Sequence, residues 1–333
     1  MTLKRTGSGY AALFTEYNNK VALDELTVKY RRVVRRRALL IVNPKAGNMR
    51  AMSIVAPTVK ALSEAGYESM VFTTDSCGDA AVIAAEYGAE SELLICSGGD
   101  GTVNEAVRGV MELEKEQRPV IGCIPMGSTN DFAGAIGLPK QRKKQIETAI
   151  SGVPTEVDVG RFNGRYYAYL ASFGAFTDIS YSTSQEYKNV FGFLAYIGSG
   201  VNSIANIHPI KALVLTDTRM IEGEFAFVSI SNTPSIAGVI NYARKNRVDL
   251  NDGLFEVMLI DYHKNAMELS RIAHALSTGD FSCDLMHCFL CSEVRFIFDK
   301  PVKWMLDGEL AQAGHEVLIE NIHSAVRLML PKG

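Results

Sequence analysis

The sequence lacks long hydrophobic runs, because Asn43, Lys45 or glycines interrupt every candidate. None approaches the roughly 20 consecutive apolar residues that span a bilayer. Cysteine is also scarce, with six residues in 333, and the start does not have the charged, apolar and small-residue pattern of a signal peptide. These absences disfavour an integral membrane protein and a secreted disulfide scaffold, so we expect a cytoplasmic protein.

The sequence has no strong excess of either charge. It carries 34 Lys and Arg against 37 Asp and Glu, a net charge of −3, which disfavours a globally basic nucleic-acid binder. Residues 1–37 differ, with nine Lys and Arg against three acidic residues, so this start carries +6 and the remainder −9. The basic start indicates either attraction to anionic lipid, at the inner face of the membrane, or a solvated extension.

Beyond the basic start, the pattern predicts two domains of an α/β plus β fold. Short apolar runs alternate with helix-period segments over residues 38–157, which is typical of a three-layer α/β domain with a mostly parallel sheet. Residues 158–333 show short apolar and aromatic runs between turns and one helical interruption near 264–276, which predicts a β-rich, antiparallel, sandwich-like domain. Its last residues could pack back on the first domain.

The most specific local feature is Ser97-Gly98-Gly99-Asp100-Gly101-Thr102, between an apolar strand and a helix. Three glycines let the backbone approach a bulky anion, and the N–H groups of the helix start point toward it. Asp100 adds a carboxylate suited to Mg²⁺ bound by phosphate oxygens. Two more loops, 43–47 and 125–133, follow neighbouring strands. Each alone could be an ordinary strand-to-helix connection, but three at one sheet edge favour a nucleotide site.

Other patterns are weaker. The chain has neither G-x-x-x-x-G-K-[ST] nor G-x-G-x-x-G after the first strand, which disfavours a P-loop NTPase and a dinucleotide-binding dehydrogenase. Cys283, His287, Cys288 and Cys291 lie within nine positions, but their spacing lacks a paired C-x-x-C knuckle, so buried core residues are favoured over zinc ligands. By spacing alone, Leu306-Asp307-Gly308-Glu309 is a hairpin with an Asp-Gly turn.

Taken together, the motifs resemble the diacylglycerol kinase catalytic-domain family of soluble bacterial lipid kinases, which is related to the NAD kinases. The resemblance runs from about residue 38 to 331. It rests on Asn43-Pro44-x-x-Gly47, the Gly-Gly-Asp-Gly-Thr-x-Asn-Glu run at 98–105, Pro125-x-Gly127-x-x-Asn130-Asp131-Phe132-Ala133 and Leu306-Asp307-Gly308-Glu309. The last of these motifs favours the lipid kinases over the NAD kinases.

The resemblance implies ATP and Mg²⁺ bound between the two domains, with Asp307 as the general base and Glu309 beside it. It also implies that Asp158 and Lys188 join a charge network that reaches the metal. The ATP-binding residues it implies are Asn43, Lys45, Gly98, Gly99, Asp100, Gly101, Thr102, Asn104, Gly127, Ser128, Thr129, Asn130 and Asp131. A structural Mg²⁺ site is implied at Asp249, Asp252 and the Leu254 carbonyl. Asn48 and Ser128 depart from the family pattern.

The implied reaction is phosphorylation of a lipid alcohol at the membrane surface, most directly diacylglycerol to phosphatidic acid. An NAD kinase-like enzyme acting on a soluble acceptor and a nucleotide- or lipid-sensing protein that keeps the fold are the alternatives. Acyl-chain pockets are lined by generic apolar side chains, so a sphingoid base or phosphatidylglycerol also stays open as the acceptor. The sequence leaves the oligomeric state open, a homodimer included.

Overall fold

The computed structural model describes residues 2–6, 9–13, 36–128, 130–174, 208–233, 235–236, 240–241 and 249–332. Residues 1–35 form one compact unit and residues 36–333 another. In the first, β1 (Thr2–Thr6) and β2 (Gly9–Leu13) pair as an antiparallel hairpin. Arg36 and Arg37, from the predicted basic start, instead begin the second unit and form ion pairs with Glu92 and Glu90 at 2.6 Å. Two of the nine positive charges are therefore neutralised locally.

The second unit begins with a parallel sheet in the order β4-β3-β5-β6, as the alternating pattern predicts. Its strands are β3 (Arg36–Val42), β4 (Tyr67–Thr73), β5 (Leu93–Gly98) and β6 (Val120–Pro125). The strands β3, β5 and β6 are almost wholly buried, because helices cover both faces of the sheet.

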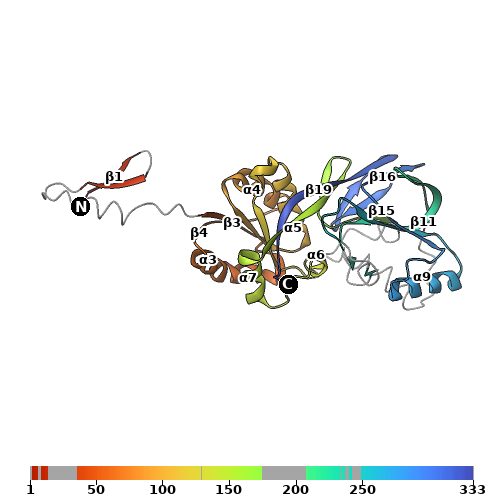
Figure 1. The fold of residues 1–333 in the computed structure, drawn as a ribbon, viewed down its shortest axis with the longest axis horizontal. Coiled ribbons are helices and arrows are strands. Elements are labelled where there is room, and N and C mark those ends of the chain that lie inside the picture. The colour runs from red at the N-terminus through yellow and green to blue at the C-terminus, as the bar shows by residue number, and fades with distance from the viewer. Residues whose placement is uncertain are drawn as a thin grey trace. The chain divides into compact units, whose positions relative to one another are not determined.

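The helices on the two faces belong to different hydrophobic clusters. Side chains of α4 (Asp79–Tyr87) and α5 (Asp100–Met111) pack in one, and those of α3 (Val55–Glu64) and α7 (Arg142–Ser151) pack in the other. Figure 1 shows this three-layer arrangement, with α4 on one side of the strands and α3 and α7 on the other. Short elements complete the connections: α2 (Ala46–Met49), η1 (Ala51–Ile54), η2 (Gly88–Glu90), η3 (Lys115–Gln117) and α6 (Asp131–Ala135).

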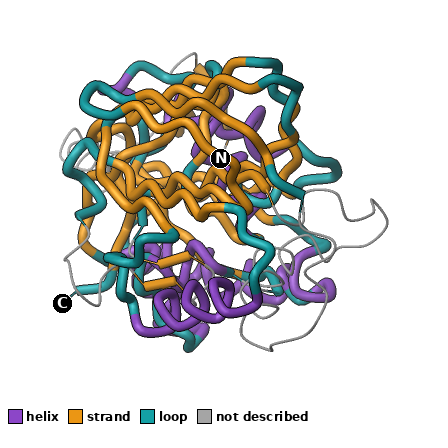
Figure 2. Tube along the Cα trace, turned by 90° about the vertical axis from the view of Figure 1, so that its right-hand side faces the viewer, coloured by secondary structure: helices purple, strands orange, loops and turns teal. Residues whose placement is uncertain are grey.

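The strands after residue 152 are antiparallel to one another and continue the same sheet, which has 15 strands among the described residues. They are β7 (Val153–Phe162), β8 (Arg165–Tyr167), β9 (Leu170–Gly174), β10 (Ile210–Leu215), β11 (Met220–Ser231), β14 (Phe255–Asp261), β15 (Met286–Cys291), β16 (Glu293–Phe298), β17 (Lys303–Leu306), β18 (Glu309–Gln312) and β19 (Glu316–Leu330). A short pair, β12 (Ser235–Ile236) and β13 (Ile240–Asn241), stands apart from this sheet. In Figure 2 most strands lie in the upper part, and helices, among them α9 (Ala266–Thr278), run along the lower edge, with further helices behind the strands.

The strand β19 joins the two halves of the sheet. Its first part pairs antiparallel with β16, and Arg327 and Leu328 pair in parallel with Val120 and Ile121 of β6. β7 follows it along most of its length, with a shift in register between Ile322 and Val326. Two apolar runs in the sequence, 316–319 and 325–330, therefore belong to one bulged strand rather than two.

Candidate active site

Three loops meet at the carboxyl ends of β3, β5 and β6, where the order of a parallel sheet places ligand-binding loops. They line a pocket of about 520 Å³. Its lining includes eight residues that the sequence predicts for ATP: Asn43, Lys45, Gly99, Asp100, Gly101, Thr102, Gly127 and Ser128. The structure therefore brings most of the predicted nucleotide residues into one cavity.

The glycines of this pocket are needed because the loops touch backbone to backbone. A Cβ built on Gly127 would lie 2.7 Å from the Cα of Gly99 and 2.9 Å from Oδ1 of Asn130. A Cβ on Gly98 would lie 2.4 Å from Oγ1 of Thr102. A side chain at Gly127 would push the loops after β5 and β6 apart, and one at Gly98 would displace the Thr102 side chain, so both positions require glycine.

The start of α5 faces the pocket and is joined to the loop after β3. Nδ2 of Asn43 donates a hydrogen bond to Oγ1 of Thr102 at 3.2 Å, and Oδ1 of Asn43 accepts one from the N–H of Lys45 at 3.0 Å. The Lys45 ammonium donates to the Asp75 carbonyl at 3.0 Å, on the rim of the same pocket. A helix N-terminus beside a lysine favours an anion electrostatically.

Two carboxylates lie together here, Asp100 buried and Asp131 half-buried. The Asp100 carboxylate accepts hydrogen bonds from the N–H groups of Asp131 at 3.0 Å and Phe132 at 3.2 Å, and so caps α6 from another helix. Burial raises the pKa of Asp100, against the lowering effect of these hydrogen bonds. Burial and the neighbouring Asp100 raise the pKa of Asp131 to about 6. The site is thus short of positive charge where two carboxylates meet.

Unsatisfied amide oxygens add to these carboxylates. Asn130 has φ 54° and donates from Nδ2 to the Gly127 carbonyl at 2.8 Å, but its buried Oδ1 has no hydrogen-bond partner among the described residues. Neither amide atom of the buried Asn104 has a partner there either. Crowded carboxylates with raised pKa values and an orphaned amide oxygen match the hard oxygen ligands that Mg²⁺ prefers, so the residues present fit that ion.

Asp307 lies in the two-residue turn between β17 and β18, with φ 49°, followed by Gly308 at 89°. The hairpin predicted from spacing is therefore present. The Asp307 carboxylate is 3 % exposed and accepts hydrogen bonds from the N–H groups of Ala168 at 2.6 Å, Tyr169 at 2.9 Å and Leu170 at 2.7 Å. Its own N–H donates to the Leu170 carbonyl at 2.9 Å. One residue thus closes the turn and carries a fixed, buried carboxylate.

Burial raises the pKa of Asp307 to about 6, although the three N–H groups act to lower it. The charge of Asp100 also raises it. Asp100 comes from the α/β half and Asp307 from the antiparallel half, 207 residues later in the chain. Phe132, whose N–H donates to Asp100, and Tyr169, whose N–H donates to Asp307, have ring centroids 6.1 Å apart, so the two acidic residues are bound by neighbouring segments.

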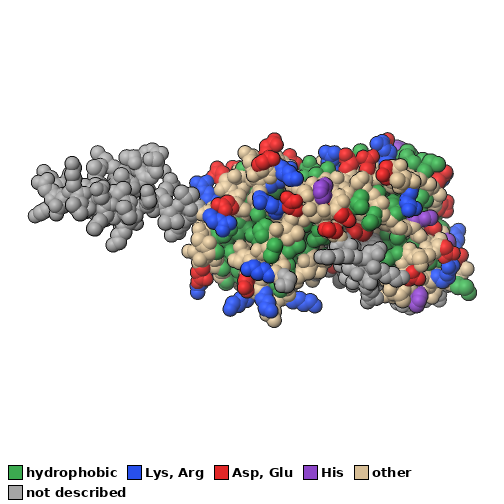
Figure 3. Space-filling view, in the orientation of Figure 1, with side chains coloured by type: hydrophobic (Ala, Val, Ile, Leu, Met, Phe, Trp, Pro, Cys, Tyr) green, Lys and Arg blue, Asp and Glu red, His purple; other side chains and the backbone are tan. Residues whose placement is uncertain are grey.

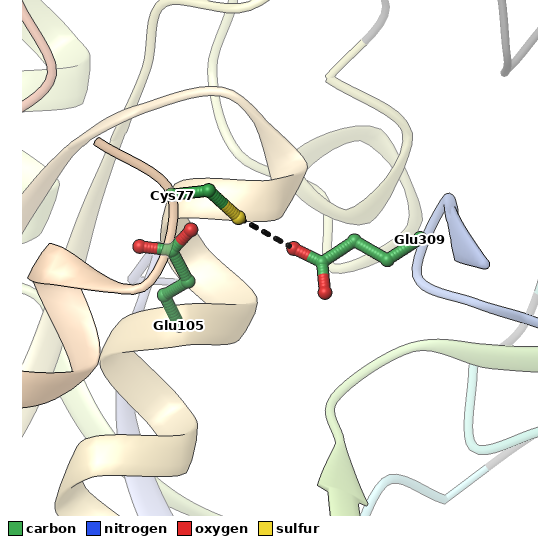
Figure 4. A group of neighbouring side chains, drawn as sticks. All are labelled: Cys77, Glu105 and Glu309. Atoms are coloured by element: carbon green, nitrogen blue, oxygen red, sulfur yellow. Dashed lines mark hydrogen bonds between the residues drawn. The ribbon is translucent and has the colours of Figure 1, made fainter. Parts of the chain in front are cut away.

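Glu309 contacts the α/β half through its carboxylate, as Figure 4 shows. It forms ion pairs with Arg165 and, at 3.9 Å, with Arg108 of α5, and it accepts a hydrogen bond from Sγ of Cys77 at 3.8 Å. Glu105, on the other side of Cys77, accepts from the N–H of Ala80 at 3.2 Å, near the start of α4. Burial, together with both carboxylates, raises the pKa of Cys77 to about 11, so this side chain is a thiol at neutral pH.

Asp158 is 1 % exposed and joins β7 to two irregular segments. Its carboxylate accepts hydrogen bonds from the N–H groups of Gly253 and Ser324, both at 2.7 Å, and contacts Nδ1 of His323 at 3.0 Å. These contacts link the turn before β14 to the bulge in β19. A role in a catalytic charge network stays a prediction.

Asp249 and Asp252 lie in that same turn before β14. Asp249 accepts from the N–H of Asn251 at 3.2 Å, and Asp252 accepts from that of Leu254 at 3.0 Å. Burial raises the pKa of Asp252, and the charges of Asp158 and Asp249 raise it further, against its hydrogen bond from Leu254. The turn thus gathers negative charge, and Mg²⁺ binding there stays a prediction.

Some predicted residues lie elsewhere. Thr129 and Lys188 are outside the described residues. The cysteines and histidine of 283–291 do not form a metal-binding group among the described residues, where such a group occurs only at Cys77, Glu105 and Glu309. Sequence reasoning missed Arg108, Arg165 and Cys77 as partners of Glu309, because they come from separate segments and no local motif marks them.

The geometry can be compared with known proteins. Residues 37–162 match the family model of the diacylglycerol kinase catalytic domain. The chain is 31% identical to a diacylglycerol kinase of Bacillus subtilis over 300 residues, covering 89% of this chain and 97% of that protein. It is 34% identical to a diacylglycerol kinase of Staphylococcus epidermidis over 249 residues, covering 74% of this chain and 77% of that protein.

Solved structures show the same fold. A crystal structure described as a diacylglycerol kinase from Bacillus anthracis superposes with a TM-score of 0.68 at 20% identity, covering 90% of this chain and 98% of that one. Another structure from the same organism superposes with a TM-score of 0.74 at 21% identity, again covering 90% and 98%. No helix among the described residues is long and apolar enough to cross a membrane.

Proposed function

Because the chain belongs to the diacylglycerol kinase family of ATP-dependent lipid kinases, we propose that it transfers the γ-phosphate of ATP to the free hydroxyl of diacylglycerol, giving phosphatidic acid. The observation that carries this proposal is Asp307, a buried carboxylate held by three N–H groups of a segment that neighbours the one binding Asp100. Phosphoryl transfer needs a carboxylate beside the attacking hydroxyl and charge compensation beside the phosphates. Asp307 would supply the carboxylate, and Asp100 would hold the Mg²⁺ that compensates the charge.

In this proposal the loops after β3, β5 and β6 bind the triphosphate. The N–H groups at the start of α5, the Thr102 hydroxyl and the Lys45 ammonium face its negative charge. Asp100, Asp131 and Asn130 would hold Mg²⁺, which supplies neutralisation of phosphate charge when bound. Asp307 accepts the proton of the lipid hydroxyl as its oxygen attacks the γ-phosphorus, and the bond to the β-phosphate oxygen breaks.

Glu309 would hold Asp307 at a fixed distance from the phosphates. Its ion pair with Arg108 attaches the β17–β18 hairpin to α5, the helix whose first turn carries Asp100 and Thr102. Its ion pair with Arg165 attaches the hairpin to β8. Because the base and the phosphate loop are on different halves of the sheet, such a contact sets their separation, and small displacements of reacting groups are costly to the rate.

The experiment is transfer of labelled γ-phosphate from ATP, with Mg²⁺, to diacylglycerol dispersed in detergent. Parallel reactions contain a sphingoid base, phosphatidylglycerol or NAD as the acceptor. We expect label in phosphatidic acid. Label in another lipid alone would correct the acceptor, label in NAD alone would move the chain to the soluble-acceptor branch, and ATP binding without transfer to any of them would favour a sensor.

The pH dependence of turnover should report Asp307. A general base must be ionised, and burial raises its pKa to about 6, so activity should be full near pH 8 and fall as the pH drops through 6. At pH 5, about a tenth of the base is ionised, and kcat/KM for the lipid should fall about tenfold. Initial rates in constant-ionic-strength buffers measure this profile. A profile flat between pH 5 and 8 would contradict the assignment.

We further propose that the enzyme works peripherally, at the cytoplasmic face of the membrane, and that α7 contributes to attachment. Figure 3 shows Lys and Arg gathered over the region of α7, where Lys140, Lys143 and Lys144 are exposed. Each basic residue near an anionic surface contributes roughly 1 kcal/mol. Replacing all three by Gln should weaken binding to phosphatidylglycerol-containing vesicles more than tenfold in a sedimentation assay.

The matched control replaces Lys264, Lys300 and Lys332, which are exposed in other parts of the second unit, and so changes the net charge equally. Equal loss in both triple variants would show that net charge, and not the surface at α7, sets the binding. Added salt should weaken binding of the wild type, because the attraction is screened.

A further inference from the structure

The antiparallel strands β9, β11 and β14 have two unlike faces. Side chains alternate along a strand, and cross-strand partners share a face. One face carries only apolar residues over this region: Ala171, Phe173, Val228, Ile230, Phe255 and Val257, each 1 % exposed or less. The other face carries Leu170, Ser172, Ser229, Ser231, Glu256 and Met258 at the same level. Four polar side chains thus lie among apolar ones on this buried face.

The register aligns these polar residues into a row. Ser231 lies opposite Leu170 of β9 on one side and opposite Glu256 of β14 on the other, and Ser229 lies opposite Ser172. Ser229 and Ser231 are fully buried, and Glu256 is 7 % exposed. Oγ of both serines and Oε2 of Glu256 have no hydrogen-bond partner in the described part of the chain.

Three neighbouring orphaned atoms are unusual, because buried polar groups in folded proteins are almost always hydrogen-bonded. They are not needed to fill space, since Val or Leu would do so without the cost of an unsatisfied polar group. The row is therefore better explained by a ligand that supplies the missing partners than by packing.

The row begins at the proposed catalytic base. The N–H of Leu170 donates to Oδ1 of Asp307 at 2.7 Å, and the Leu170 carbonyl accepts from the N–H of Asp307. Adjacent strands lie about 5 Å apart, so Ser231 is one strand spacing from Leu170, and Glu256 is two. Leu170 also belongs to the hydrophobic cluster that contains Phe132 of α6 and Ile272 of α9, so this face looks toward both halves of the enzyme.

The serines of the row are uncharged donors. Each serine hydroxyl donates one hydrogen bond. Ser229 and Ser231 therefore suit neutral carbonyl oxygens and give no compensating charge to a phosphate.

We infer that Ser229 and Ser231 bind the ester carbonyl oxygens of a glycerolipid acceptor whose free hydroxyl lies at Asp307. The inference rests on the proposed function and makes its acceptor specific. In a diacylglycerol the ester carbonyls lie only a few bonds from the free hydroxyl, which matches a donor row that starts one strand from the base. A dialkylglycerol, with ether links, lacks these carbonyl acceptors.

The test compares diacylglycerol with the dialkylglycerol of equal chain length in mixed micelles. The wild type should prefer the ester in kcat/KM. Ser229→Ala and Ser231→Ala should each lower the ester-to-ether ratio about five- to tenfold, the range expected for a lost hydrogen bond to a neutral group. The change should lie in KM for the ester. Ser231→Thr, which keeps a hydroxyl donor, should retain most of the preference.

Thr58→Val is the matched control. Thr58 is fully buried in α3, and its Oγ1 also has no partner among the described residues, so its loss should leave the ratio unchanged. Equal use of ester and ether by the wild type, or an unchanged ratio in both row variants, would overturn the inference. A fall in Tm with an unchanged ratio would assign the row a structural role. Failure of the proposed function is distinct, because the wild type would then label neither lipid.

Discussion

Replacing Asp307 by Asn should lower kcat for lipid phosphorylation by about a hundredfold or more, the range that a positioned general base contributes. Asn tolerates the left-handed backbone of this turn, where φ is 49°. The substitution therefore removes the proton acceptor while keeping the hairpin. Initial rates with labelled ATP, at saturating lipid and pH 8, measure the loss.

Two measurements distinguish a loss of catalysis from a loss of the folded structure. The Asp307 carboxylate accepts three N–H groups, and the Asn amide nitrogen cannot accept, so the variant should lose about 1–3 kcal/mol of stability yet remain folded by circular dichroism. Its Kd for ATP should stay within about threefold of the wild type, because Asp307 does not line the nucleotide pocket. Asp299→Asn, an exposed position, is the control. Turnover within a few-fold of wild type would exclude Asp307 as the base.

Gly127→Ala should weaken ATP binding by more than tenfold. The new methyl group would lie 2.7 Å from the Cα of Gly99 and 2.9 Å from Oδ1 of Asn130, closer than carbon and oxygen atoms pack. Both obstacles are parts of the nucleotide loops, so relief requires the loops after β5 and β6 to move apart. Calorimetric titration with a non-hydrolysable ATP analogue measures the Kd directly.

Gly134→Ala provides the contrast. Gly134 is in α6, seven residues further along, and a Cβ there meets no atom within 4 Å. Alanine is favoured over glycine inside a helix by about 0.5–1 kcal/mol, so this variant should bind ATP normally and melt at the same or a higher temperature. Similar affinity losses in both variants would mean that the loop contact is not the cause.

The sequence was most informative where function and local structure depend on neighbouring residues. Gly98, Gly99 and Asp100 follow a buried strand and open a helix, so the turn between them and its place at the pocket could be predicted from one segment. The alternating pattern likewise predicted β3 to β6 and their helices with small errors at the ends. For Leu306-Asp307-Gly308-Glu309, spacing predicted the hairpin, which the structure confirms. The family resemblance predicted Asp307 as a base, which stays a prediction.

Contacts between distant segments were not predictable. Arg165, Arg108 and Cys77 surround Glu309 although they lie 144, 201 and 232 residues before it. No periodic pattern in the sequence predicts contacts between residues so far apart. The row at Ser231 and Glu256 escaped notice for a related reason, because a strand with both faces buried does not alternate clearly between polar and apolar residues. Its significance depends on register, which sequence alone does not fix.

The pairing of β19 with β6 also bears on the order in which the chain folds. During synthesis, β3 to β6 emerge more than 150 residues before Arg327 and Leu328, which pair with Val120 and Ile121. Until then, β6 is an open edge that can pair with other chains. The α/β half would therefore complete its sheet only after the antiparallel half has been made. A fragment ending near residue 151 should aggregate, since the catalytic halves share one folding unit.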